Sequence, residues 1–323
     1  MYNIFNKYKS GVIFLIKLII VGSAFYLISQ KVITNNTLFS PSFLNGLQAN
    51  LLSHATFFIL IILLTLSNWL LEIFKWQTLI STIKHITFFQ ASKQSLSSLT
   101  ASLLTPNRIG EYGVKAIHYP KNKRTQVMFL NFLGHFSQMF ATILFGLLGF
   151  VYLGKDLTSH LQLSSYEALV FILIITLITI FLFKKYWLKY WLKITDHIKV
   201  IPNKIHFNNH LLSIIRYLIF SHQFYLLLFI LGSDINYLTA MSLIFCTYLI
   251  ASILPGFVVF DWVIKGSVAV TLFQFFGVNE IIILSITSLM WLLNFALPSI
   301  VGSYFVLTFN HKNLVLKENR IHS

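Results

Sequence analysis

The residues with the clearest chemical potential lie in an apolar stretch that a proline interrupts. The segment SLLTPNRIGEYGVKA, residues 102–116, holds Arg108, Glu111 and Lys115 at spacing i, i+3 and i+7, which would place all three on one face of a helix. A charge near the centre of a bilayer costs about 2.5–3.5 kcal/mol on insertion scales, so three together must face one another or a polar cavity. Arginine can hold a phosphate through two parallel hydrogen bonds, and we expect Arg108 to do so.

The start of this helix adds positive potential to the same place. Pro106 suits the first helical turn, and Thr105 can cap it. The free backbone amides at a helix N-terminus attract anions, so we expect Arg108, Gly110 and these amides to form a phosphate seat, with Lys115 as a further point charge. The alternative is a structural network of paired charges that only holds the helix against its neighbours.

A second stretch, SILPGFVVFDWVIKGS at residues 252–267, repeats the order of a proline, an acid and a lysine four positions after the acid. Asp261 and Lys265 correspond to Glu111 and Lys115, although the distance from proline to acid differs by one residue. Ion pairs at i, i+4 also recur by chance. We expect Lys265 to act on a phosphate as a point charge, while Glu111 and Asp261 orient the cations or bind a coupling proton or a substrate amine.

Other polar residues in apolar segments are candidates for the lining of the same cavity. Asn131, His135 and Gln138 fall at i, i+4 and i+7, and interhelical hydrogen bonding explains them equally well. Glu72 fits either the cavity or an ion pair at the membrane interface. Arg216 is interpreted as an arginine that extends its charge to the interface rather than as a ligand.

Composition places these side chains in a membrane. Of the 323 residues 56% are hydrophobic and only 10% are charged, too few charges to cover a soluble domain. The basic residues lie between apolar blocks, which favours contact with lipid headgroups over nucleic acid. The single cysteine, Cys246, is expected to be a small core residue. Six stretches are long enough to span: about 11–30, 55–80, 125–153, 166–183, 210–232 and 280–308.

Two further apolar regions, about 89–118 and 238–276, are each cut by a proline and carry charges beyond it. We expect each to be a helical hairpin that returns to its own side of the membrane, which is tolerable only where it is buried or lines a cavity. In this layout nearly all lysines and arginines fall on one side, so both termini are predicted to be cytoplasmic. The hairpins then enter from opposite sides, as in an inverted repeat within a single domain, 1–323.

Several motifs resemble one known family. They are SNWLLEIFKW at 67–76, LLTPNRIGEYGVKA at 103–116, SHQFYLLLFILG at 221–232 and ILPGFVVFDW at 253–262. Over about residues 10–310 the chain resembles the flippase-like transmembrane domain of bacterial lysylphosphatidylglycerol synthases. That resemblance implies an all-α bundle of six spans and two re-entrant hairpins that moves or binds phospholipids or polyprenyl-linked lipids. The chain departs from the family where it has PGFVVFD in place of a glycine-rich PGGxG run, and NFLGHFSQ where an E-R pair is common.

We therefore predict a flippase of the cytoplasmic (inner) membrane that binds an anionic lipid headgroup at a midplane cavity. The alternatives are a lipid-binding partner subunit of a lipid-synthesising or lipid-modifying enzyme, and a lipid-modifying membrane enzyme. The enzyme is disfavoured because the chain has no HExxH, GxSxG or P-loop pattern and few acidic residues. No catalytic residue, metal, cofactor or nucleic-acid partner is predicted.

Overall fold

The computed structural model describes residues 55–103, 105, 108–161, 200–253 and 261–309, together with Tyr26, and it places Ala55, residues 155–161 and Asp261 by their backbone alone. Over these ranges the chain is helical, with short turns and no strand. The elements are α3 (Ala55–Ile80), α4 (Phe88–Ser102), α5 (Ile109–Ile117), the 3₁₀ turn η1 (Lys121–Lys123), α6 (Arg124–Leu161), α8 (Asn203–Ile230), α9 (Tyr237–Ile253), α10 (Asp261–Gln274), α11 (Glu280–Trp291), the π-helical turn η3 (Leu292–Ala296) and α12 (Leu297–Thr308).

Four helices in the described part of the chain are long and apolar enough to cross a membrane: Thr56–Ile80, Lys121–Gly154, Asn203–Ile230 and Glu280–Thr308. They confirm the helices predicted at 55–80, 125–153, 210–232 and 280–308. The predicted spans 11–30 and 166–183 lie outside the described residues, apart from Tyr26.

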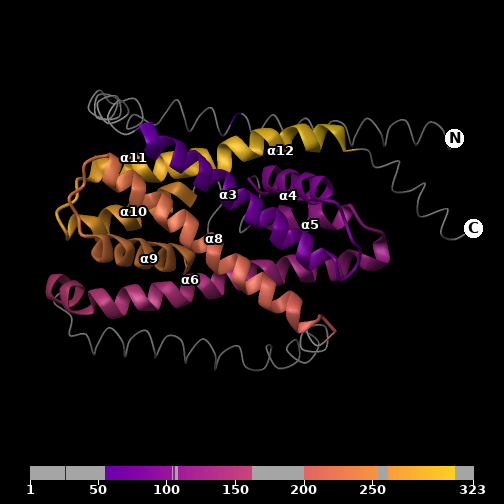
Figure 1. The fold of residues 1–323 in the computed structure, drawn as a ribbon, viewed down its shortest axis with the longest axis horizontal. Helices are drawn as coiled ribbons and strands as arrows, with labels where there is room; N and C mark the ends of the chain where they lie inside the picture. The colour runs from indigo at the N-terminus through magenta and orange to yellow at the C-terminus, as the bar shows by residue number, and fades with distance from the viewer. Residues whose placement is uncertain are drawn as a thin grey trace, which may run out of the picture.

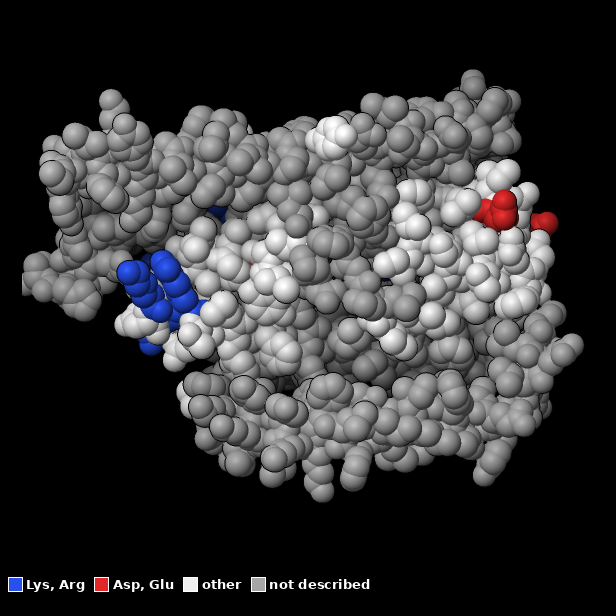
Figure 2. Space-filling view, turned by 180° about the vertical axis from the view of Figure 1, so that it is seen from behind, with Lys and Arg blue, Asp and Glu red and all other residues white. Residues whose placement is uncertain are grey.

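The surface of the described helices fits a membrane environment. Large apolar side chains of α3 such as Ile62, Leu63 and Leu66 are more than half exposed. Lysines and arginines gather at one end of the face drawn in Figure 2, and acids gather at the opposite end. The exposed charges near the helix ends are Lys84, Lys121, Lys123 and Lys204 on one side, and Asp234 and Glu280 on the other. Apolar sides between charged ends indicate a multi-pass membrane protein.

Three pairs of helices form the frame. In Figure 1, α6 runs along one long side of the molecule and the continuous α11–η3–α12 rod along the other, while α3 and α8 cross the middle together. At one end α4 packs against α12, and at the other end α9 packs against α6. Both contacts depend on a glycine. A Cβ on Gly149 would come within 2.7 Å of the Ser242 carbonyl oxygen, and one on Gly302 would overlap the backbone of Leu96.

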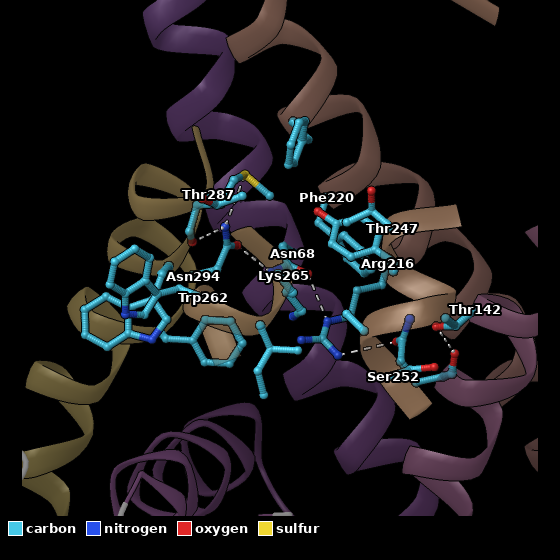
Figure 3. Close-up of a pocket in the computed structure, with 18 of the residues that line it drawn as sticks. Asn68, Thr142, Arg216, Phe220, Thr247, Ser252, Trp262, Lys265, Thr287 and Asn294 are labelled. Atoms are coloured by element: carbon cyan, nitrogen blue, oxygen red, sulfur yellow. Dashed lines mark hydrogen bonds between the residues drawn. The ribbon is translucent and has the colours of Figure 1, made fainter. Parts of the chain in front are cut away.

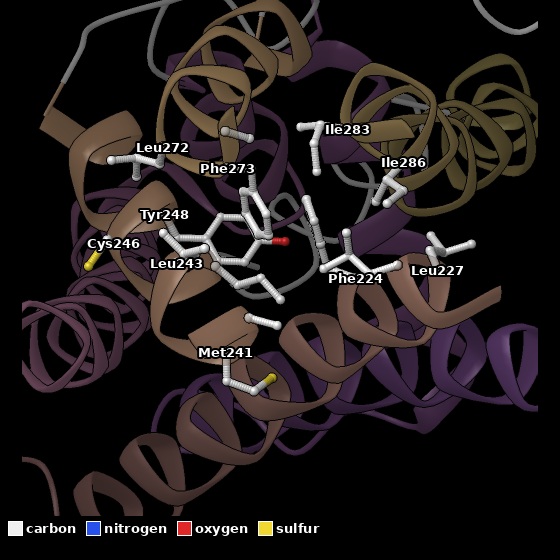
Figure 4. Packing of buried hydrophobic residues seen from close by; sticks show 14 of the residues in the cluster. Phe224, Leu227, Met241, Leu243, Cys246, Tyr248, Leu272, Phe273, Ile283 and Ile286 are labelled. Atoms are coloured by element: carbon white, nitrogen blue, oxygen red, sulfur yellow. The ribbon is translucent and has the colours of Figure 1, made fainter. Parts of the chain in front are cut away.

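The largest apolar core lies between α8, α9, α10 and α11 (Figure 4). Phe224, Leu243, Phe273 and Ile286 are almost wholly buried there. Cys246 is also buried in this cluster, which confirms the prediction of a core residue. This packing fixes α9 and α10 against α8, and so fixes one wall of the space described below.

The break between α4 and α5 differs from the prediction. Helix α5 begins at Ile109 and not at Pro106, because Arg108 adopts the left-handed backbone conformation with φ of 60°. That conformation interrupts a right-handed helix and costs about 1–2 kcal/mol in a residue other than glycine. The hydroxyl of Thr105 still accepts a hydrogen bond at the new N-terminus, from the Gly110 amide at 2.8 Å.

Candidate functional site

A cavity of about 390 Å³ lies at the centre of the bundle, walled by α3, α6, α8, α9, α10 and the α11–η3 segment, with Arg108 at the start of α5. Figure 3 shows Arg216 and Lys265 reaching toward it from different helices. Its aromatic lining comprises Phe220, Phe224, Tyr248, Trp262, Trp291 and Phe295. Among the described residues that line it, three carry positive charges and none is acidic. The cavity therefore favours an anion with an apolar portion.

Arg108 and Lys265 meet at the same aromatic ring. The Arg108 guanidinium carbon lies 5.3 Å from the centre of the Phe295 ring, and the Lys265 ammonium lies 5.7 Å from it. Lys265 is also 5.6 Å from the centre of the Tyr248 ring. These contacts hold two cations beside one space by attraction to the ring faces.

A third cation, Arg216 of α8, connects the cavity to a buried ion cluster. Its Nη1 donates to Glu72 Oε2 at 2.7 Å, and its Nε donates to Asn68 Oδ1 at 2.9 Å. Lys75 Nζ contacts the same Glu72 Oε2 at 2.7 Å. Gln138 Oε1 lies 3.4 Å from Arg216 Nη1. One carboxylate oxygen thus serves two cations, and we call Glu72, Lys75 and Arg216 the Glu72 cluster.

A chain of amide hydrogen bonds continues from this cluster into η3. Asn68 donates to Asn294 Oδ1 at 2.7 Å, and Asn294 donates to Gln223 Oε1 at 3.0 Å. The Asn294 backbone oxygen accepts from Trp69 at 3.1 Å. Within the π-helical turn, Asn294 therefore joins the hydrogen-bond network and the next residue, Phe295, contacts the two cations. Turns of this kind often occur at functional sites.

A separate cluster lies between α5 and α6. Lys115 Nζ donates to Glu111 Oε1 and to Asn131 Oδ1, both at 2.7 Å, and it lies 4.4 Å from the centre of the Trp76 ring. His135 Nε2 is 3.3 Å from Glu111 Oε2. Lys115 is only 1% exposed, so the ammonium is held wholly inside the protein. These residues form what we call the Glu111 cluster.

The predicted site residues therefore divide between two places. Arg108, Lys265 and Gln138 line the cavity, whereas Glu111, Lys115, Asn131 and His135 pair with one another beside it. Arg108 precedes helix α5 as its N-cap, with φ of 60°, and lines the cavity, whereas Glu111 and Lys115 pair with each other within the helix.

Three other assignments changed or stay open. Gly110 serves packing, since a Cβ there would lie 2.7 Å from the Ala101 carbonyl oxygen of α4. Glu72 is 9% exposed and does not line the cavity, and it forms the ion pair with Lys75. The side chain of Asp261 lies outside the described residues, although the backbone puts this residue at the start of α10, one turn before Lys265.

Sequence reasoning missed Arg216, which was expected to extend to the membrane interface. Its side chain is instead 13% exposed and bonded to Glu72. The available signal was the pair Asn68 and Glu72 at i, i+4 on α3, which offers two acceptors on one helical face. Within the described ranges, no three His, Cys, Asp or Glu side chains group closely enough to hold a metal ion.

Comparison with known proteins finds no matching family model and no matching curated protein.

Proposed function

We propose that this chain is a flippase that binds the headgroup of an anionic phospholipid or a polyprenyl-linked lipid and moves it across the cytoplasmic membrane, as its resemblance to flippase-like domains implies. One observation carries the proposal. Arg108 and Lys265, from corresponding proline-broken segments far apart in the sequence, line one aromatic cavity and lie over the same Phe295 ring. Cations from two different segments beside one largely apolar cavity favour an anionic ligand.

The packing of the helices supports an inverted repeat. In such a repeat α3 would correspond to α8, α4 to α9, α5 to α10, and α6 to the α11–α12 rod. The α4–α12 contact then corresponds to the α9–α6 contact, the α5–α6 contact to the α10–α11 contact, and the α3–α4 contact to the α8–α9 contact. All these pairs are in contact. In our proposal the α4–α5 and α9–α10 pairs are re-entrant hairpins entering from opposite sides, and rocking of one half against the other exposes the cavity alternately.

The charged ends support an orientation. Exposed lysines cluster near the end of α3 and the starts of α6 and α8, so we assign this end, with both chain termini, to the cytoplasm. The cavity then lies between the two membrane faces, where a headgroup can be reached from either side in turn.

The test is transport of fluorescent phosphatidylglycerol in vesicles that contain the purified protein. Arg108→Lys keeps the charge but loses the planar fork, and Lys265→Gln removes a charge, so both should slow transport about tenfold or more. Lys123→Gln, which removes an exposed charge in η1, is the matched control and should transport at the wild-type rate.

Transport at the wild-type rate by both Arg108→Lys and Lys265→Gln would refute the proposal. Tight phosphatidylglycerol binding without transport would instead favour the lipid-binding partner subunit.

A further inference from the structure

The Glu72 cluster carries one more positive charge than negative charge. Glu72, at 9% exposure, is the one acid in contact with Lys75 and Arg216 among the described residues, and both cations use its Oε2 at 2.7 Å. The neighbouring Glu111 and Lys115 balance each other and supply no spare negative charge. An excess charge inside an apolar bundle is costly, so the cluster is arranged to receive an anion.

Arg216 is the member of the cluster that can receive it. This side chain lines the cavity, while Lys75 does not. Its hydrogen bonds to the described residues use Nε and Nη1, so Nη2 has no partner among them. A phosphate in the cavity could therefore take the Nη1–Nη2 edge of the guanidinium as a bidentate partner, in exchange for Glu72.

The exchange leaves no buried charge stranded. When Arg216 turns to a phosphate, Glu72 keeps Lys75 at 2.7 Å. Without Lys75 the same movement would leave a lone carboxylate inside the bundle, which is strongly unfavourable. Because Lys75 remains bound to the same carboxylate oxygen, Arg216 can leave Glu72 without leaving that carboxylate unpaired.

We propose that Arg216 is a phosphate-binding residue that switches between Glu72 and a phosphate in the cavity. Because Arg216 joins α8 to α3 through Glu72 and Asn68, the switch loosens the contact between the two helices at the centre of the bundle. The ligand chemistry is a phosphate group, from a lipid headgroup or from free phosphate. The inference extends the proposed function by adding a third cation and a link from occupancy to helix packing.

The experiment measures the affinity of the purified full-length protein in detergent micelles, from the shift in its melting temperature as a ligand is titrated. The probes are phosphatidylglycerol, phosphatidylcholine with the same acyl chains, and inorganic phosphate. Arg216→Gln should weaken binding about tenfold or more. Glu72→Gln removes the competitor and should tighten binding by a similar factor. Lys123→Gln is the control and should bind like the wild type.

Opposite effects of the two substitutions are the decisive result, because a merely structural ion pair would make both variants bind more weakly. Lys75→Gln provides the same test if Glu72→Gln does not fold. It leaves Glu72 dependent on Arg216 alone, so binding should weaken although Lys75 does not line the cavity. Changes in the same direction for Arg216→Gln and Glu72→Gln, or no change in Lys75→Gln, would overturn the switch.

The probes separate this inference from the proposed function. If phosphatidylglycerol binds and Arg108→Lys weakens it while Arg216→Gln does not, the lipid site stands and the switch is refuted. If inorganic phosphate gives the whole response and phosphatidylglycerol gives none, the Arg216 site stands and the lipid function falls. If neither probe shifts the melting temperature, both are refuted.

Discussion

Replacing Lys115 with methionine should destabilise the protein strongly, because its ammonium is the main partner of a buried carboxylate. Lys115 is 1% exposed and Glu111 5% exposed, and their 2.7 Å hydrogen bond lies inside the bundle. Methionine fills a similar volume, so the loss comes from charge and not from a cavity. Breaking a buried pair on one side costs about 3–5 kcal/mol, and Asn131 Oδ1 also loses its donor.

The companion variant removes both charges. Lys115→Met with Glu111→Leu leaves no stranded carboxylate, so the loss should shrink to about 1 kcal/mol or vanish. The free energy of unfolding would be measured by titrating the protein with SDS in mixed micelles. Lys123→Met, on the exposed turn η1, is the matched control and should stay within about 0.5 kcal/mol of the wild type. A loss below about 1 kcal/mol for Lys115→Met, or a double variant that equals the sum of the two single ones, would refute the reasoning.

Three other outcomes are expected. Gly302→Leu should separate α12 from α4 at Leu96 and lower the melting temperature or abolish folding, since even a Cβ overlaps that backbone; an unchanged melting temperature would contradict the packing. Asn294→Leu strands the Asn68 donor and the Gln223 acceptor and should cost about 2–4 kcal/mol in the same SDS titration, with an effect below about 0.5 kcal/mol counting against the network. Reporter fusions should give a cytoplasmic signal at 118–124 and an external one at 154–165, and two signals on the same side would exclude the proposed topology.

The helices were predictable where the signal is local. The apolar run and its length give α3 and the rod from Glu280 to Thr308 almost to the residue. The start of α5 was not predictable in this way, because the left-handed turn at Arg108 depends on how α4 and α5 pack around Gly110. Proline suggested a helix start that the tertiary contacts moved by three residues.

The site was predictable in its charges but not in its pairing. Glu111 with Lys115 follows from i, i+4 spacing, and the structure contains that pair. Arg216 with Glu72 joins residues 144 positions apart, and no periodicity within one helix indicates which partner an arginine will find. Pairing across helices is fixed by packing. Here the packing places Arg216 inside the bundle, whereas the sequence alone predicted that it would extend to the membrane interface.

The π-helical turn η3 has a consequence for register. Such a turn accommodates one residue more than an α-helix would in the same length, so α12 is rotated relative to α11 by about 100° from where an unbroken helix would put it. Phe295 within the turn lines the cavity, and Gly302 beyond the turn packs against α4. Deleting a single residue between Leu292 and Ala296 would restore a regular helix, yet it would bring the two faces out of phase. The number of residues in this turn is therefore constrained.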